Sequence, residues 1–175
     1  IATAVQGAGS AFDPVYRLGE QIAEPLREHL GMSPGEAAAR VGALAGRVGL
    51  GARHLRAYPH QRSGGEKQRA MLTMALSCEP ELLIVDEPTS GQDVLSRARL
   101  IDLLRQVRDE TGLSLILISH DLAAAAQVAE RILVMRQGEI VEGGPANRIV
   151  TQPQHDYSRA LVQAAPALDW AVGNP

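Results

Sequence analysis

Leu82-Leu83-Ile84-Val85-Asp86-Glu87 is the stretch of the chain that decides the fold. Its four apolar residues do not alternate with polar ones, which is typical of a strand covered on both faces in a parallel sheet. Two carboxylates follow at the carboxyl end of that strand, where open α/β sheets bind ligands. A carboxylate is costly to desolvate there unless a cation or hydrogen-bond donors meet it. Asp86 is therefore a candidate ligand of Mg²⁺ beside a phosphate, and Glu87 a candidate for orienting water. Taken alone, the pair fits a strand that ends in a charged turn equally well.

A second apolar run, Leu113 to Ser119, lies one helix further along the chain. Strand, helix and strand in this order predict a right-handed βαβ crossover and hence an α/β class. His120 follows the second run directly, so we expect it near Asp86 and Glu87 at the same edge of the sheet. A lone histidine there is more often a capping or core residue. The intervening helix is predicted from apolar residues on one face, namely Leu95, Leu100, Leu103, Leu104 and Val107.

Ser63-Gly64-Gly65-Glu66-Lys67-Gln68-Arg69 precedes a helix that we predict from Glu66 to about Cys78. Ser63 is a good N-cap residue, and two glycines would let a phosphate approach the exposed backbone N–H groups. The N-terminus of a helix adds about 0.3–1 kcal/mol of attraction toward an anion. The alternative is an ordinary Ser-Gly-Gly loop with a helix cap.

The other predicted elements are short and lie on both sides of these motifs. They are a buried strand from Ile1 to Gln6, a helix opened by the capping box Ser33-Pro34-Gly35-Glu36, a hairpin of 131–135 with 139–141, and a mostly helical tail from Ala146. With 45% hydrophobic but only 3% aromatic residues, the core must consist mainly of Ala, Val, Leu and Ile.

Composition excludes several classes of protein. The net charge of −3 comes from dispersed charges, so no nucleic-acid footprint is present. The single cysteine, Cys78, cannot form an intramolecular disulfide, which fits a reducing compartment. No apolar run reaches the roughly 18–20 residues that a membrane span needs.

The four motifs, in this order and spacing, resemble the ATP-binding-cassette (ABC) ATPase family along nearly the whole chain. Gln6 matches the Q-loop, Ser63-Gly64-Gly65 the signature motif, and Leu82 to Glu87 the Walker B strand. Asp93 falls in the D-loop, and His120 matches the switch histidine.

Within that family, several segments look like the importers of oligopeptides, dipeptides and nickel. They are Asp13-Pro14-Val15-Tyr16, Gly19-Glu20-Gln21-Ile22, Tyr58-Pro59-His60-Gln61 and the tail from Pro153 to Leu161, in which Asp156 stands where proline is usual.

The chain also departs from the family pattern. It contains no G-x-x-x-x-G-K-[ST], the loop that cradles the phosphates, and the aromatic residue that stacks on adenine is missing with it. Arg62 and Glu66 flank the signature where apolar and amide residues are commoner, and the D-loop reads Ser90-Gly91-Gln92-Asp93. Ile1 is no initiator methionine and reads as a strand already under way. We therefore expect the C-terminal part of a subunit, unable to bind ATP alone.

The resemblance implies a partial P-loop NTPase fold, with a parallel sheet and helices, a helical subdomain and a C-terminal helical extension. The expected division is 1–12 for the Q-loop strand, 13–78 for the helical subdomain, 79–145 for the α/β core and 146–175 for the extension. It further implies a peripheral subunit on the cytoplasmic face of the plasma (inner) membrane. Its partners would be a second ABC ATPase subunit, identical or different, permease subunits and, indirectly, a binding protein.

The cofactors implied are ATP and Mg²⁺, and the reaction is ATP hydrolysis that energises uptake. Glu87 would be the general base, Asp86 would bind Mg²⁺, and His120 would contact the γ-phosphate. Gln6 would sense Mg²⁺ and water and link the subunit to the permease. The residues implied to contact nucleotide, in part across a dimer, are Ser63, Gly64, Gly65, Gln68 and Asp93.

Two alternatives stay open. The chain could be a non-catalytic module, either truncated or a pseudo-ATPase, that docks on a permease. It could also be an ABC ATPase of DNA repair or of ribosomes, but the coiled-coil insertion, second cassette and basic linker of those types are absent. An in-frame Walker A motif upstream of the codon for Ile1 would make the chain a fragment of an ordinary ATPase.

Overall fold

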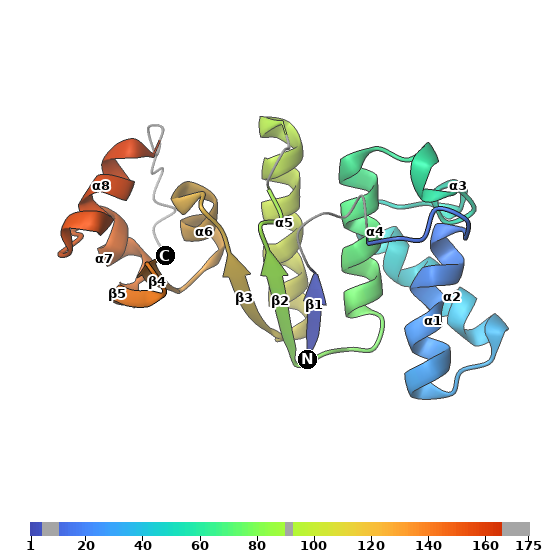
Figure 1. The fold of residues 1–175 in the computed structure, drawn as a ribbon. Helices are drawn as coiled ribbons and strands as arrows, with labels where there is room; N and C mark the ends of the chain where they lie inside the picture. Colours follow the sequence, from blue (N-terminus) through green and yellow to red (C-terminus); the bar gives the residue numbers. More distant parts are fainter. Residues whose placement is uncertain (5–10, 90–92, 166–175) are drawn as a thin grey trace. The chain divides into compact units, whose positions relative to one another are not determined.

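The computed structural model describes residues 1–4, 11–89 and 93–165. The chain divides into two compact units, Ile1–Ile118 and Ser119–Pro175, each with its own elements and packing (Figure 1).

The first unit is built on a parallel sheet of three strands. Its strands are β1 (Ala2–Ala4), β2 (Leu82–Asp86) and β3 (Ser114–Ile118), with β2 in the centre. Val85 pairs with Ala4 on one side, and Asp86 pairs with Ile118 on the other. The predicted α/β class with a parallel sheet is therefore confirmed, and the predicted central strand carries the two carboxylates at its carboxyl end.

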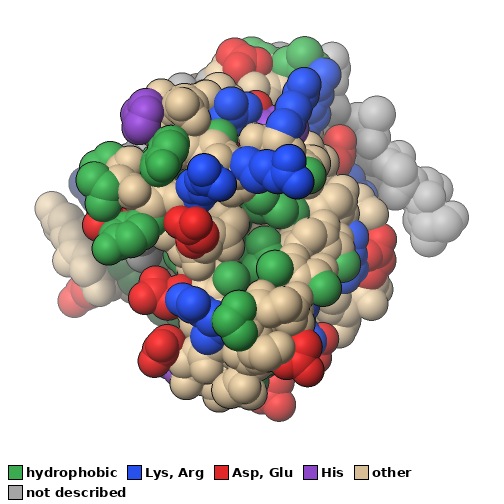
Figure 2. Space-filling view, turned by 90° about the vertical axis from the view of Figure 1, so that its right-hand side faces the viewer, with side chains coloured by type: hydrophobic (Ala, Val, Ile, Leu, Met, Phe, Trp, Pro, Cys, Tyr) green, Lys and Arg blue, Asp and Glu red, His purple; other side chains and the backbone are tan. Residues whose placement is uncertain are grey.

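Helices pack against this sheet and against one another. Figure 1 shows α4 between the sheet and the pair α1 and α2. The helices are α1 (Leu18–Leu30), α2 (Pro34–Arg47), α3 (Ala52–Leu55), a 3-10 turn η1 (Pro59–Gln61), α4 (Gly64–Leu76) and α5 (Val94–Thr111). The predicted capping box of α2 is confirmed, because Ser33 accepts from the Glu36 N–H while the Glu36 carboxylate accepts from the Ser33 N–H. Seen from the side of α1 and α2, charges of both signs are interspersed on the surface (Figure 2).

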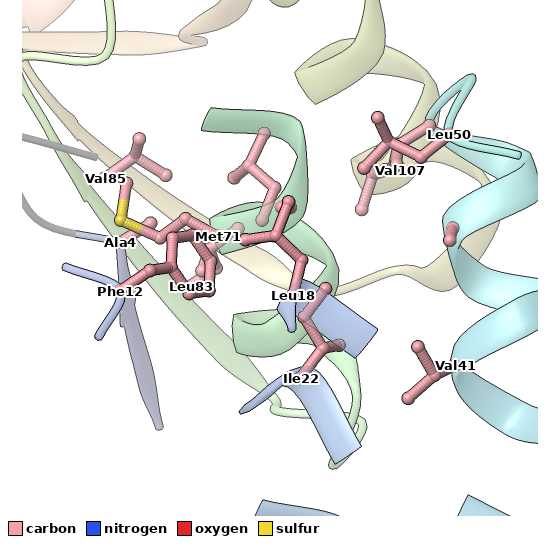
Figure 3. Close-up of a cluster of buried hydrophobic side chains, with 14 of the residues drawn as sticks. Ala4, Phe12, Leu18, Ile22, Val41, Leu50, Met71, Leu83, Val85 and Val107 are labelled. Atoms are coloured by element: carbon pink, nitrogen blue, oxygen red, sulfur yellow. The ribbon is translucent and has the colours of Figure 1, made fainter. Parts of the chain in front are cut away.

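One hydrophobic core joins the sheet to α1, α2 and α4. Leu83 and Val85 of β2 pack with Met71 of α4 and Leu18 of α1 in this cluster, as Figure 3 shows. Aliphatic residues supply nearly all of it, with Phe12 the aromatic member among the buried residues of the described ranges. Because α4 shares this core with β2, the start of α4 and the end of β2 belong to one packed framework.

Three expectations about burial are wrong. Ile1 is exposed, and β1 begins only at Ala2. Leu95 is 60% exposed, because it lies five positions before the buried Leu100 and so about 140° around the helix from it. The second strand is not covered on both faces, since Ile116 and Ile118 are 48% and 49% exposed.

The second unit contains a hairpin with short helices. Its elements are α6 (Leu122–Val128), β4 (Arg131–Arg136), β5 (Glu139–Pro145), α7 (Ala146–Thr151) and α8 (Asp156–Ala164). The predicted hairpin is confirmed, and its turn residues Gln137 and Gly138 have φ of 53° and 86°. Two consecutive positive φ values are what a type I′ hairpin turn requires. Ile132, Val134 and Ile149 form part of its own small core.

Glu142 of β5 fastens α8 to this hairpin. Its carboxylate accepts hydrogen bonds from the backbone N–H groups of Gln154 and His155, each at 3.0 Å, and from Arg148 at 3.0 Å. The buried hydroxyl of Ser158 also acts on it, although its geometry is not that of a standard hydrogen bond. Ser158, the two N–H groups and Arg148 together lower the pKa of Glu142 from 4.5 to about 2.

We expect Glu142→Gln to lower the free energy of unfolding by about 1–3 kcal/mol at pH 7, since two backbone N–H groups and Arg148 lose a charged acceptor. The carboxylate pKa is depressed in the folded state, so its contribution is complete above about pH 4.5 and disappears as the pH falls toward 2. Urea unfolding at several pH values checks this. Glu139→Gln, an exposed change on the same strand, is the control. A deficit of equal size at pH 7 and at pH 2.5 would contradict the assignment.

Candidate functional site

The two carboxylates stand where β2 ends and the chain turns. Asp86 is the last residue of β2, and the backbone N–H of Glu87 donates to the carbonyl of Ile118 at 2.9 Å. Glu87 has φ of 46°, in the left-handed region. Such a conformation costs a non-glycine residue on the order of 1–3 kcal/mol and is concentrated at functional sites. Both residues are partly buried, and Glu87 is held at the sheet edge in a strained turn.

Gln68 ties the signature helix α4 to that turn. Its side chain is buried, and Nε2 donates to the backbone carbonyl of Pro88, directly after Glu87. The structure thus shows a packing role for Gln68 within the chain, while its predicted contact with nucleotide stays a prediction. The consequence is that Gln68 of α4 directly contacts the turn that follows the carboxylate pair.

Ser63 caps α4 as the sequence predicts. Its Oγ accepts from the Glu66 N–H at 3.3 Å, and Oε2 of Glu66 accepts from the Ser63 N–H at 2.8 Å. The pKa of Glu66 is lowered first by that backbone N–H, then by the Ser63 hydroxyl, Arg62 and His54. The side chains of Ser63 and Glu66 therefore satisfy backbone donors at the beginning of α4 reciprocally.

Gly64 and Gly65 are not required by the conformation of the chain itself. Neither is among the glycines with positive φ. A Cβ on Gly64 would meet no atom of the described residues within 4 Å, and one on Gly65 would meet only Nη1 of Arg69 at 3.8 Å, an ordinary contact. The backbone at the beginning of α4 is therefore open to an approaching group, which is the space that the signature interpretation needs.

Asp93 is the N-cap of α5. Its carboxylate accepts from the Ser96 N–H at 2.9 Å and from the Ser96 hydroxyl at 2.6 Å. The Ser96 hydroxyl is the largest cause of the lowered pKa of Asp93, followed by the Ser96 N–H. Capping accounts for Asp93 within this chain, and its predicted contact with nucleotide stays a prediction.

The two remaining predicted residues, Gln6 and His120, stay predictions. Gln6 lies outside the described residues. His120 is an exposed residue of the second unit, two positions after β3 ends. Its expected closeness to Asp86 and Glu87 stays a prediction.

His54 is a residue of this region that sequence patterns do not indicate. It is 8% exposed, and Nε2 lies 3.3 Å from Oε1 of Glu66. One histidine in a four-residue helix, twelve positions from its partner, carries no motif or periodicity that could have pointed to the contact.

Two cavities lie in the first unit. A small one of about 20 Å³ separates the starts of α4 and α5, and its walls include Gly65, Gln68 and Ser96. A larger one of about 520 Å³ is at the opposite end of the sheet, where Glu81 precedes β2 and Ser114 begins β3, and no predicted site residue lines it.

The described ranges contain no cluster of three or more His, Cys, Asp or Glu side chains arranged to hold a metal. Within the same ranges, every helix is too short or too polar to cross a membrane. Asp86 alone, with water and phosphate oxygens, would suit Mg²⁺, which usually takes only one or two carboxylates from the protein.

Comparisons with known proteins identify the family of the chain. The family model described as ABC transporter matches residues 4–90. A relative from Brucella ovis, whose name describes a peptide import ATP-binding protein, is 43% identical over 161 residues, covering 91% of this chain and 48% of the relative. A relative from Brucella melitensis biotype 1 with the same description is 43% identical over 171 residues, covering 97% and 52%. The chain thus spans about half the length of these relatives.

Solved structures show the same fold. The dimeric structure of MJ0796, a bacterial ABC transporter cassette, has a TM-score of 0.73 and 26% identity, covering 83% of this chain and 62% of that one. The structure of cbiO1 from Clostridium perfringens has a TM-score of 0.77 at 22% identity, covering 86% and 59%. The parallel sheet with its carboxylate pair and the capped Ser-Gly-Gly turn fit these similarities. Together they show that the chain belongs to the ABC transporter family of ATP-binding proteins.

Proposed function

We propose that the complete subunit containing this chain hydrolyses ATP to energise uptake of peptides through a membrane permease. The observation that carries the proposal is the placement of Asp86 and Glu87 at the carboxyl end of the central parallel strand. The turn that follows them is bonded to the signature helix α4 through Gln68 and Pro88. The names of the relatives favour peptides as the transported substrates, and the importer-like segments favour oligopeptides, dipeptides or nickel.

In this proposal the chain's own residues position water and charge. Glu87 accepts a proton from the attacking water as general base, and the strained turn aims its carboxylate. Asp86 would hold Mg²⁺, and the ion would neutralise phosphate charge. His120 and Gln6 contact the γ-phosphate and the attacking water, respectively. Catalysis of this kind consists mainly of positioning and electrostatic stabilisation.

Ser63, Gly64 and Gly65 serve the site of a second subunit. The open backbone at Gly64 leaves room for a phosphate, and the N-terminus of the 13-residue helix α4 favours an anion. Asp93 and Gln68 support this contact from the start of α5 and from within α4. The partners are therefore a second ABC ATPase subunit, permease subunits at the cytoplasmic face of the inner membrane and, indirectly, a binding protein.

The rival proposal is a non-catalytic module that docks on a permease. It would apply if the gene encoded only this chain, which spans about half the length of its relatives. Sequencing the DNA upstream of the codon for Ile1 decides between the two. An in-frame Walker A motif supports the ATPase, and a stop codon directly upstream supports the module.

The 175-residue chain alone should bind Mg-ATP with a dissociation constant no lower than about 1 mM. Even a constant of about 1 mM requires about 4 kcal/mol of binding free energy. The N-terminus of α4 attracts an anion with only about 0.3–1 kcal/mol of free energy. The 175 residues contain no Walker A loop that could contribute further binding energy. Calorimetric titration, with the complete subunit as the positive control, measures this. A micromolar constant with one site per chain would contradict it.

A further inference from the structure

His54 is buried between two partners that use its two ring nitrogens differently. Nδ1 accepts a hydrogen bond from the Gly51 N–H at 2.9 Å, at the beginning of α3. An accepting Nδ1 carries no proton, so the ring proton must be on Nε2. Nε2 lies 3.3 Å from Oε1 of Glu66. The protonated ring nitrogen is therefore the one beside the Glu66 carboxylate, in a polar contact whose geometry is not that of a standard hydrogen bond.

Glu66 in turn holds the signature turn, which is Ser63-Gly64-Gly65. Its other oxygen, Oε2, accepts from the Ser63 N–H at 2.8 Å. Arg62 competes for the first oxygen, because its Nη1 lies 3.8 Å from Oε1. Nε of Arg62 is buried without a hydrogen-bond partner among the described residues, so Arg62 has donor capacity to spare. If His54 released Oε1, the carboxylate could rotate toward Arg62 and away from Ser63.

We propose that His54 is a positioning residue of the signature turn, acting through Glu66. It fixes the carboxylate in the orientation that receives the Ser63 N–H, which keeps the Ser63 hydroxyl and the open Gly64 backbone in one arrangement. The role in hydrolysis rests on the proposed function of the complete subunit. The role in shaping the turn does not.

A matched pair of variants separates the two contacts of His54. In His54→Gln, the amide nitrogen occupies about the place of Nε2 and can still donate to Glu66, while the acceptor for Gly51 is lost. In His54→Asn, the amide oxygen occupies about the place of Nδ1 and can still accept from Gly51, while the donor to Glu66 is lost. Each variant loses one buried contact, so similar losses of stability are expected.

Amide hydrogen exchange in the 175-residue chain tests the turn directly. His54→Asn should speed exchange of the Ser63 amide at least about 10-fold, and His54→Gln should leave it within about 3-fold of the parent. The Gly51 amide should show the reverse order. Equal effects of both variants on Ser63, or none, would overturn the proposal whatever the subunit's activity.

ATP hydrolysis by the complete subunit tests the consequence. With amounts normalised to folded protein, His54→Asn should lower kcat about 10-fold with little change in KM, because the signature acts on the γ-phosphate in the closed dimer. His54→Gln should retain most of kcat. A loss in His54→Gln that equals the loss in His54→Asn would refute positioning through Glu66. A complete subunit without any ATPase activity would refute the proposed function, and the exchange result would still decide the role in the turn.

Discussion

Replacing Glu87 by Gln in the complete subunit should lower the rate of ATP hydrolysis by about 10²–10⁴-fold, the usual effect of losing a general base. ATP binding should be unchanged, because the amide has nearly the shape of the carboxylate and Asp86 remains in place for Mg²⁺. The variant should therefore accumulate as an ATP-bound dimer. Single-turnover hydrolysis measures the rate, and gel filtration with and without ATP measures the dimer.

The position of Glu87 makes this substitution informative. The backbone N–H of Glu87 bonds to Ile118, and its φ of 46° is a property of the turn that Gln would share. Fold stability should thus change little, and a large loss of rate would report on the carboxylate itself. Glu81→Gln, an exposed change just before the other end of β2, is the control. Unchanged steady-state hydrolysis in Glu87→Gln would show that the base lies elsewhere.

Local sequence patterns were sufficient to predict the central strand and the helices that begin with a capping residue. The apolar run of β2 predicted the central strand, and Ser33 and Ser63 predicted the starts of α2 and α4. In each case, one stretch of sequence contains all the atoms that decide the outcome. A capping box, for example, involves residues only three positions apart.

Contacts between distant segments could not be predicted in this way. The bond from Gln68 to Pro88 and the contact of His54 with Glu66 join residues on different elements, and their types are common on any helix. The exposure of Ile116 and Ile118 on β3 was missed for a related reason. An apolar run shows that a strand prefers burial, but the neighbouring segments determine which faces are covered.

The role of glycine at the signature turn needed both kinds of evidence. The sequence suggested that Gly64 and Gly65 leave space for a phosphate, and an ordinary Ser-Gly-Gly loop with a helix cap was the alternative. Their ordinary φ values and the open space around a Cβ on Gly64 show that the conformation of the chain does not require glycine there, while the Ser63 cap fits both interpretations. The contact of this turn with another subunit therefore stays a prediction.

Ser63→Asp in the complete subunit should abolish ATP-driven dimerisation and hydrolysis while the fold survives. Aspartate and asparagine cap helices about as well as serine, whose loss to alanine would cost about 0.5–2 kcal/mol. The aspartate, however, places a negative charge opposite the partner's γ-phosphate and close to Glu66, which already accepts from the Ser63 N–H. Ser63→Asn keeps the cap without the charge, so it should retain far more activity. Thermal unfolding and ATPase rates of both variants measure the two effects.

Mixing experiments then decide whether Ser63 acts on the partner's nucleotide. The second component is a subunit with an intact Ser63 but a mutated Walker A lysine. If the signature works across the interface, a heterodimer places both defects at one composite site and leaves the other site intact. Part of the ATPase activity should therefore return on mixing two preparations that are inactive alone. If Ser63 served the nucleotide of its own subunit, each site of the heterodimer would contain one defect, and no activity would return. Ser63→Asp subunits that hydrolyse ATP normally would remove the signature assignment itself, because a charge facing the γ-phosphate should not be tolerated.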